Sequence, residues 1–224
     1  MANTAKDRPI VSAPPSAGKP RRGRRRLDEG PALDRQRLTA TLIALARTEG
    51  VEALNMRRVA RELGVSARLL YHHVRNKDEM VELLADEITG LAMPDLEHDD
   101  WEQRLRSVVT NARRAYQQFR GVPAIILSRS LRTPTGPNAM CVRRGVLKAM
   151  RDAGLTDEQA DIAFVQFSVI VLGNMVLHEN LNDDGEGVAI DPERIEQGID
   201  LGLDLLLYGI RRLASGQAVL PGRR

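Results

Sequence analysis

The chain has 224 residues, of which 28% are charged, and its single cysteine excludes an intramolecular disulfide framework and fits a reducing compartment. Residues 1–26 carry eight basic residues against one acidic, residues 27–78 nine against seven, and residues 79–224 sixteen against twenty-two. The first third is therefore the part whose charge suits nucleic acid, whereas the remainder would repel phosphate.

Residues 1–26 are rich in Pro, Gly, Ser and Ala and have no periodicity, so we expect a disordered basic arm. Its Lys19–Arg26 cluster could lie along phosphates, with Arg22 and Arg24 entering a narrow minor groove. The alternative is a solvated tail that adds only non-specific attraction. No apolar run follows the basic residues, so we expect no signal peptide.

The stretch Asp34–Lys77 predicts three short helices. Asp34–Glu49 forms the first, which ends at Gly50. The next two would bury apolar residues at helical spacing: Val59, Ala60 and Leu63 after an Asn55 cap, then Leu70 and Val74 after a Ser66 cap. Gly64 lies between them, where a tight turn needs positive φ. This pattern is typical of a helix-turn-helix whose second helix can enter a DNA major groove.

A connecting helix is predicted from the Asn76 cap to about Leu91, with Glu79 at the third position completing a capping-box-like pair. Met93 and Pro94 end it, and an acidic link follows. No later segment alternates as a strand does, so the fold is expected to be all-α. The remaining expected elements are Trp101–Phe119, a short segment Gly121–Leu131 broken by Pro123, Pro137–Asp152, Thr156–Leu181 and Asp191–Ala214.

The last two helices are apolar on more sides than one chain can cover. Ile162–Leu177 is apolar nearly all round, and the final helix has two apolar faces: Ile195, Ile199, Leu203, Leu206 and Ile210 on one, Leu201, Leu205 and Leu207 on the other. We expect a homodimer that pairs them in a four-helix bundle; the alternative is a monomer with two core helices. Ile162–His178 contains Gln166 and Asn174 and is shorter than the roughly 20 residues of a membrane span, so no membrane partner is expected.

The run Leu70-Tyr71-His72-His73-Val74-Arg75-Asn76-Lys77-Asp78, with Leu63-Gly64-Val65-Ser66 before it, resembles the DNA-binding domain of the tetracycline-repressor (TetR) family. Ala153–Leu177 looks like a dimer helix of the tetracycline repressors, and Trp101 after an acidic loop matches as well. The resemblance implies a helix-turn-helix domain at 33–91 and a ligand-binding and dimerisation domain at 95–216. It also implies a homodimer that binds palindromic double-stranded DNA and responds to a small-molecule effector.

The resemblance places the recognition helix at Ala67–His73. The candidate DNA-binding residues are Arg57, Ser66, Ala67, Arg68, Leu69, Tyr71, His72, His73 and Lys77. Arg68 can take guanine O6 and N7 together, and Lys77 matches a lysine that clamps phosphate at a helix N-terminus. The alternatives are a surface or phosphate-only role for Arg68 and a packing role for Tyr71.

In this family, ligand contacts in the body push on the connecting helix and change the spacing of the two DNA heads. The candidate effector-facing residues are Val108, Ala112, Tyr116, Phe119, Ile126, Phe164 and Phe167, and ordinary core packing is the alternative for each. The histidines that hold magnesium–tetracycline in the namesake repressors have no counterpart between Gly90 and Leu131 apart from His98. We therefore do not expect tetracycline as effector. Neighbouring His72 and His73 point about 100° apart, so no metal or other cofactor is predicted.

These features together predict a cytoplasmic, nucleoid-associated transcriptional regulator, a repressor that a small molecule releases from its operator. The alternative is an architectural DNA-binding protein without an effector. An enzyme is not expected, because the sequence has no nucleophile–base pair, phosphate loop or metal cluster, and Cys141 has no recognisable partner.

Overall fold

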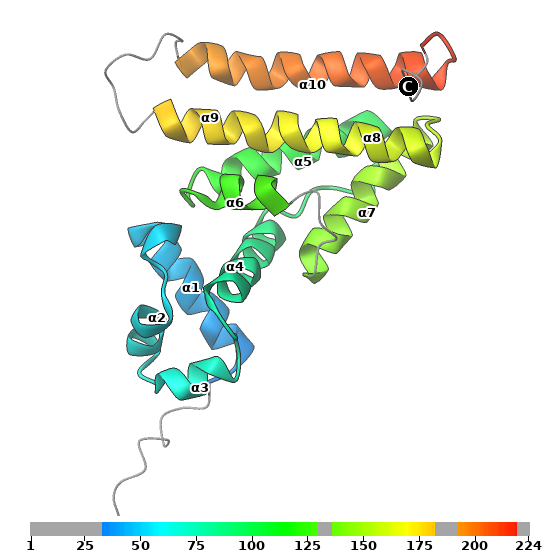
Figure 1. Cartoon of the computed structure of the whole chain (residues 1–224). Helices are drawn as coiled ribbons and strands as arrows, with labels where there is room; N and C mark the ends of the chain where they lie inside the picture. Colours follow the sequence, from blue (N-terminus) through cyan, green and yellow to red (C-terminus); the bar gives the residue numbers. More distant parts are fainter. Residues whose placement is uncertain (1–32, 130–135, 182–191, 219–224) are drawn as a thin grey trace, which may run out of the picture.

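The computed structural model describes residues 33–129, 136–181 and 192–218; within these ranges there is no strand, and the all-α prediction is confirmed. The arm 1–26 and the expected Asp191 cap lie outside the described residues. In Figure 1, α1–α3 form a small head below a body of α5–α10, and α4 joins the two. The elements are α1 (Arg35–Glu49), a 3-10 turn (Val51–Ala53), α2 (Met56–Leu63), α3 (Ala67–Tyr71), α4 (Lys77–Leu91), α5 (Trp101–Tyr116), α6 (Val122–Arg129), α7 (Pro137–Asp152), α8 (Asp157–Ser168), a π-helical turn (Val169–Gly173), α9 (Asn174–Leu181) and α10 (Pro192–Ala214).

The head is held by a small apolar core under the three short helices. Leu38 and Leu42 of α1 are at most 1% exposed, and Leu70 of α3 is fully buried. Burying one such leucine contributes roughly 1.5–3 kcal/mol, so a few of them fix the angle between helices that are individually too short to be stable. Arg37 adds a polar tie, because its Nη2 donates to the Leu63 carbonyl oxygen at the end of α2 at 2.6 Å.

Helix α4 begins as predicted at the Asn76 cap, whose Oδ1 accepts the Glu79 N–H at 2.8 Å. The expected capping-box-like pair is wrong in one respect, because the Glu79 side chain does not bind the Asn76 N–H. The Glu79 carboxylate accepts the Arg75 N–H at 2.6 Å and pairs with the Arg75 guanidinium at 3.0 Å. The arginine one residue upstream offers a charged partner, which an uncharged Asn76 N–H cannot match.

The α5–α6 corner differs from the prediction in two ways. Helix α5 ends at Tyr116, so Phe119 lies in the following turn rather than on the helix. Pro123 does not break α6, because it is the second residue of Val122–Arg129, in a first turn that needs no backbone N–H. Beyond Arg129 the expected segment to Leu131 lies outside the described residues.

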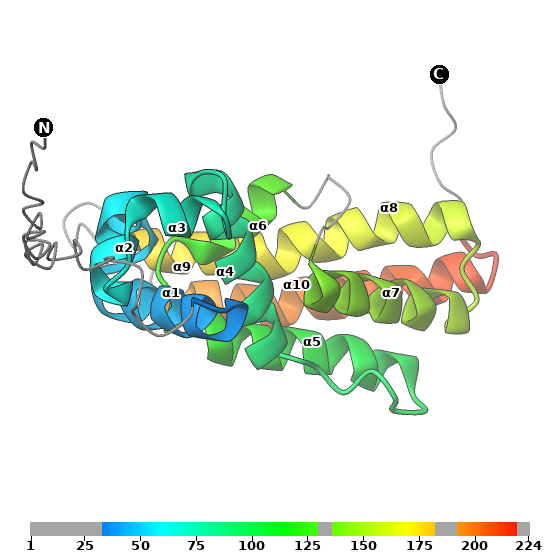
Figure 2. The ribbon, with the colours of Figure 1, turned by 90° about the horizontal axis from the view of Figure 1, so that it is seen from below.

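Helices α8 and α9 form one long rod, as predicted, but a π-helical turn interrupts it at Val169–Gly173. Just after this turn, Nδ2 of Asn174, the first residue of α9, donates to the Ile170 carbonyl oxygen at 2.7 Å. The rod runs alongside α10 in both views, and the head lies under one end of the body (Figures 1 and 2). The close approach depends on Gly202, since a Cβ there would meet the Ile170 side chain at 3.3 Å.

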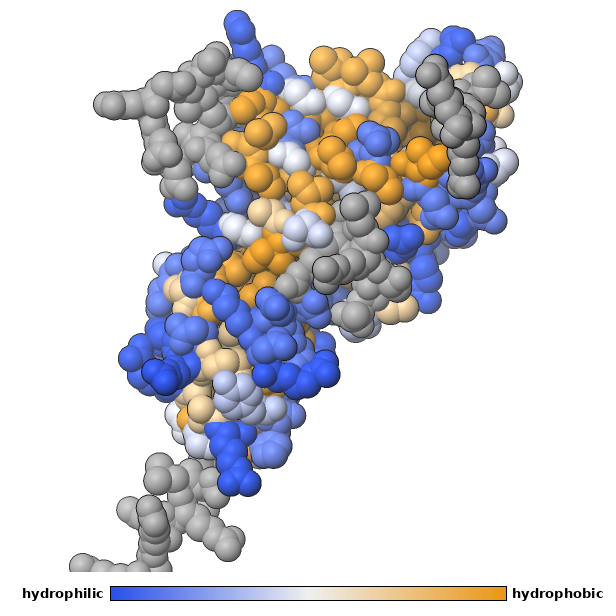
Figure 3. Space-filling view, viewed as in Figure 1, coloured by the Kyte–Doolittle hydropathy of each residue, from blue (hydrophilic) through white to orange (hydrophobic). Residues whose placement is uncertain are grey.

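The rod and α10 each leave an apolar stripe uncovered. The stripes consist of Ile162, Val165, Val169 and Leu177 on the rod, and Leu201, Leu205 and Tyr208 on α10. Figure 3 shows apolar side chains gathered over this part of the body, while the head is mostly hydrophilic. The two faces of α10 agree with the prediction except at two neighbouring residues. Leu206 was predicted on the face with Ile199 and Leu203, but it is Leu207 that is buried there, at 1% exposure, while Leu206 is half-buried. Successive helical residues point about 100° apart, so neighbouring leucines could not share a face.

Asp157–Glu179 is 23 residues long and apolar enough to cross a membrane by length and composition alone. The uncharged stretch Ile162–His178, expected to be too short and too polar to span a membrane, is thus part of a longer helix that meets this criterion. In the structure it is instead a body helix that packs on α7 and α10. Buried helices of soluble proteins meet the same criterion of length and composition.

Candidate nucleic-acid interface and ligand cavity

The turn between α2 and α3 is closed by backbone hydrogen bonds around one left-handed residue. Gly64 has φ 66° and ψ 29°, a conformation that side-chain-bearing residues avoid. Its N–H donates to the Arg61 carbonyl at 3.1 Å, and the Val65 N–H donates to the Ala60 carbonyl at 3.0 Å. Ser66 then caps α3 by accepting the Leu69 N–H at 3.2 Å. The pattern expected from the sequence is present, and it fixes α3 across the end of α2.

Helix α3 has a buried and an exposed face. Leu70 is fully buried and Val74, just after the helix, is 2% exposed. The exposed face carries most of the residues expected to contact DNA: Ser66, Ala67, Arg68, Tyr71, His72 and His73. Leu69 is half-buried against the core, so less of it can reach a base edge. Tyr71 is 53% exposed, which disfavours the packing alternative.

The predicted recognition helix Ala67–His73 is shorter than expected. Regular α-helix ends at Tyr71, and His72 is its C-terminal cap. The His73 N–H still donates to the Leu70 carbonyl oxygen at 2.9 Å, so both histidines stay on the exposed side of the head.

Three arginines of α2 and α3, namely Arg57, Arg58 and Arg68, differ in their partners. Arg58 bridges Glu49 and Glu62, with both nitrogen–oxygen distances 2.6 Å, and these hydrogen bonds raise the pKa of Arg58 and lower that of Glu49. Arg57 and Arg68 are exposed and have no ion-pair or hydrogen-bond partner among the described residues. Arg58 thus ties α1 to α2, whereas the guanidinium groups of Arg57 and Arg68 remain available to an anion.

Lys77 is the first residue of α4 and is exposed beside the head. Its Nζ lies 3.4 Å from the Glu52 carbonyl oxygen, a weak contact that an incoming phosphate could replace. The N–H groups and dipole of the helix start favour an anion at the same place.

The body contains a cavity of about 380 Å³ between α4, α5, α6, α7 and α8, called here the body cavity. Six of the seven residues expected to face an effector lie in its wall: Val108, Ala112, Tyr116, Ile126, Phe164 and Phe167. The wall is mostly apolar with a few polar side chains, as small-molecule sites are.

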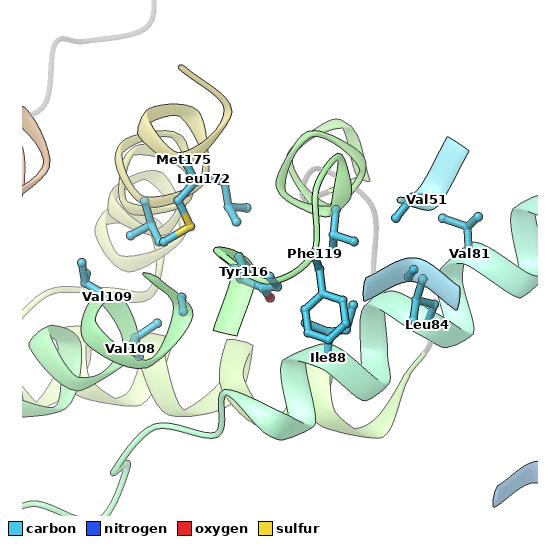
Figure 4. Packing of buried hydrophobic residues seen from close by; sticks show 14 of the residues in the cluster. Val51, Val81, Leu84, Ile88, Val108, Val109, Tyr116, Phe119, Leu172 and Met175 are labelled. Carbon is cyan, nitrogen blue, oxygen red and sulfur yellow. The ribbon is translucent and has the colours of Figure 1, made fainter. Parts of the chain in front are cut away.

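Phe119 is the exception among the expected residues, because it does not line the body cavity. It is 1% exposed and packs toward Val51, Leu84 and Ile88, while Tyr116 points the other way (Figure 4). The guanidinium of Arg47, in α1, lies 5.3 Å from the centre of the Phe119 ring. Phe119 therefore joins the head to the body instead of facing a ligand, because α5 ends before it and the chain turns.

Asp86 and Arg143 belong to the cavity wall and were not anticipated. Asp86 is 5% exposed; its Oδ1 accepts the Ala139 N–H at 2.9 Å and its Oδ2 lies 3.3 Å from Asn138 Nδ2. A carboxylate of α4 therefore caps α7, whose own capping residue, Gly136, has no side chain to do so. The sequence signal was an aspartate in the middle of an otherwise helix-forming segment without a basic partner four residues away.

A second hollow of about 490 Å³ lies at the joint of head and body, lined by Arg47–Gly50 of the head and by Arg113, Arg120 and Glu179 of the body. Glu179 accepts the Gly121 N–H at 3.2 Å, and its partial burial raises the pKa of its carboxyl group. This cleft is more polar than the body cavity and would offer an apolar molecule little to bind.

Comparison with known proteins identifies the family. The sequence model described as "Bacterial regulatory proteins, tetR family" matches residues 38–84, and the tetracyclin repressor-like C-terminal domain matches residues 93–197. This chain belongs to the TetR family. TetR-family proteins are transcriptional regulators, which places the chain with DNA-binding regulators rather than with a known class of enzymes.

Individual TetR-family relatives agree with this assignment. The HTH-type transcriptional repressor DrrR1 of Streptomyces coeruleorubidus is 32% identical over 145 residues, 64% of this chain but 53% of DrrR1. The class C tetracycline repressor of Escherichia coli is 27% identical over 164 residues, 69% of this chain and 70% of that repressor. The crystal structure of the TetR-family protein ActR from Streptomyces coelicolor, in complex with (S)-DNPA, is 26% identical with a TM-score of 0.67 and covers 83% of this chain and 100% of ActR. The chain thus spans only about half the length of DrrR1.

Proposed function

We propose that the chain is a homodimeric transcriptional repressor that binds a palindromic operator and leaves it when a small molecule occupies the body cavity. The observation that carries this proposal is the double role of α4. Leu84 and Ile88 belong to the packing around Phe119, whereas Asp86 and Thr89 line the body cavity. A ligand that moves α4 must therefore move the head.

The size of the effect follows from linkage. An effector that binds the non-operator state better weakens operator binding by the same factor, and couplings of about 1–3 kcal/mol correspond to roughly 5- to 150-fold. ActR, crystallised with (S)-DNPA and with actinorhodin, supports a body that holds a small molecule.

The uncovered stripes support the homodimer. Ile162, Val165 and Val169 recur at intervals of three and four residues, as do Leu201, Leu205 and Tyr208. This spacing is the one at which helices of a four-helix bundle interdigitate, and a two-fold pairing would remove both stripes from water. A dimer would also present two α3 helices, which is why a palindromic site is proposed.

For DNA contact, we propose that Arg68 reads a base and that Arg57, Tyr71 and Lys77 bind phosphate or the groove wall, with the head at 33–91 and the effector and dimer functions at 95–216. The basic arm 1–26 would add phosphate contacts, and the dimer would act on the nucleoid in the cytoplasm. Deleting residues 1–26 should then weaken binding and flatten its salt dependence; an unchanged slope of affinity against salt excludes the arm.

The proposal is tested by selecting bound sites from random duplex DNA with the full chain at physiological salt. A two-fold symmetric consensus with a symmetric footprint is expected; no preference among sites would refute it. A thermal-shift screen of a small-molecule library distinguishes the repressor from the architectural alternative. Some ligand should stabilise a regulator and weaken its binding to the operator, whereas no ligand should stabilise an architectural protein.

A further inference from the structure

The hydrogen bonds of the body cavity show which hydroxyl groups of its wall act as donors and which as acceptors. The Thr89 hydroxyl donates to the Ala85 carbonyl oxygen at 2.8 Å. The Tyr116 hydroxyl oxygen lies 3.1 Å from Thr89 Oγ1, and because the threonine hydrogen is already used, the phenol is the donor in this contact. Burial raises the pKa of Tyr116, so it stays a neutral phenol. Its oxygen therefore offers the cavity lone pairs and no hydrogen.

The same accounting holds on the facing wall. The Ser168 hydroxyl donates to the Phe164 carbonyl oxygen at 2.9 Å, which leaves its oxygen as an acceptor. Asp86 uses its carboxylate oxygens on Ala139 and Asn138, at the positive end of the α7 dipole. The hydroxyl groups of the wall thus accept hydrogen bonds but cannot donate them.

Arg143 supplies the positive charge of the wall. Its guanidinium carbon lies 4.7 Å from the centre of the Phe164 ring, and its side chain is 33% exposed. Among the described residues its carboxylate partner is Asp161, at a nitrogen–oxygen distance of 3.8 Å, which is longer than a hydrogen bond. No hydrogen-bond acceptor for Arg143 is present among the described residues. Its planar N–H groups are therefore ready for a carboxylate or a similar anion.

The other acidic group of the wall lies toward the head. Glu82 is on α4, close to Arg75, whose pKa is raised mainly by its hydrogen bond with Glu79 and to a smaller extent by the charge of Glu82. Arg143 is on α7 and lies against α8, beside Asp161 and Phe164. An anionic ligand group is thus favoured at the α7–α8 wall and disfavoured at the α4 wall, so the cavity is polarised from one side to the other.

We propose that the effector is a carboxylic acid, or a comparable monoanion, carried on an apolar ring body with at least one hydroxyl group. The anion pairs with Arg143, the rings lie against Phe164 and Phe167, and the hydroxyl donates to the Tyr116 oxygen. This chemistry gives the Arg143 guanidinium an anion and gives an acceptor oxygen of the wall a hydrogen-bond donor. The inference rests on the proposed function, since it names what would fill the same cavity.

The test uses the full chain and a matched set of probes. The probe is a hydroxynaphthoic acid whose hydroxyl and carboxyl groups lie at opposite ends of its two rings; its methyl ester lacks the charge, and naphthoic acid lacks the hydroxyl. Titration calorimetry should give binding of the acid and at least roughly tenfold weaker binding of either analogue, the ratio expected for one hydrogen bond to a charged or buried partner. Equal binding of all three, or of none, overturns the proposal.

Variants assign the groups. Arg143→Gln should weaken the acid about tenfold while leaving the ester unchanged, and Tyr116→Phe should remove the preference for the hydroxylated probe. Arg144→Gln is the matched control, because it is the exposed neighbour on the same helix and changes the net charge equally. If Arg143→Gln and Arg144→Gln behave alike, the assignment is wrong.

Operator binding separates this inference from the proposed function. A chain that binds its selected DNA site but ignores every probe refutes the ligand chemistry and leaves the repressor proposal standing. A chain that binds the acid through Arg143 but shows no preference among DNA sites does the reverse.

Discussion

Replacing Asp86 by alanine should lower the free energy of unfolding and disturb the joint between α4 and α7. The carboxylate is 5% exposed and accepts the Ala139 N–H at 2.9 Å and the Asn138 amide at 3.3 Å. Gly136 offers α7 no side-chain cap, so nothing replaces Asp86 when it is removed. A hydrogen bond to a charged group contributes about 1.5–3 kcal/mol, and losing a helix cap costs about 1 kcal/mol. Because the same hydrogen bond makes the cap, the two values are not fully additive, and the free energy of unfolding should fall by about 2–3 kcal/mol.

The assay is chemical denaturation of the full chain at one fixed protomer concentration, because dimer stability depends on concentration. Asp86→Asn keeps one acceptor oxygen and should lose about half as much. Gly136→Ala should also lower the free energy of unfolding, because the added Cβ would lie 2.0 Å from Asp86 Oδ1 and would displace the capping carboxylate. Glu87→Ala is the matched control on α4. Among the described residues its carboxylate pairs only with Arg35, at 3.8 Å, so a change within about 0.5 kcal/mol is expected.

Functional measurements complete this test. If Asp86 holds α4 in the position that binds operator, Asp86→Ala should also change operator affinity or its response to ligand, and Glu87→Ala should not. A stability loss for Asp86→Ala no larger than for Glu87→Ala would refute the reasoning about the cap.

Three further predictions concern the head, the dimer and the body. Arg68→Ala should weaken binding to the selected operator by about 1–3 kcal/mol and relax one base position in a repeated selection; an equal loss on all sequences would reduce Arg68 to a phosphate contact. Leu205→Asp should give monomers by sedimentation with weak operator binding, whereas Met140→Asp, also on an exposed apolar residue, should stay dimeric. Asp152 pairs with buried Arg104 at 2.6 Å, and hydrogen bonds from Lys148 and Arg104 lower its pKa. Asp152→Asn should therefore lower the free energy of unfolding by about 1–2 kcal/mol, after allowing for solvent screening, at pH values above the unfolded pKa near 4. The difference from the parent chain should disappear as the pH falls through the lowered pKa of Asp152 in the folded state, and a difference that persists in acid contradicts the prediction.

Features set by local chemistry were predictable from the sequence. The turn around Gly64 and the caps Asn55, Ser66 and Asn76 depend on residues within a few positions of one another. The exposed face of α3 followed as well, because burying Leu70 and Val74 fixes which way the remaining side chains point.

What the sequence did not reveal depends on contacts between distant segments. Phe119 was placed in the ligand cavity, yet the end of α5 at Tyr116 lets the chain turn and direct its ring at the head. Asp86 caps a helix that begins about fifty residues later. Neither hydrophobic periodicity nor capping patterns carry information on such partners, so Arg143 and Asp86 went unnoticed although they are the charged groups of most interest in the body cavity.

The π-helical turn at Val169–Gly173 has an evolutionary consequence. It holds one residue more than regular α-helix would need between α8 and α9. Loss of a single codon there would let ordinary i to i−4 bonding run through and would swing α9 by about 100°, carrying Leu177 away from the outer stripe. Deleting one residue, without any replacement, would thus change the apolar face through which two copies pair. The same deletion would reshape the wall of the body cavity at Val171 and Leu172.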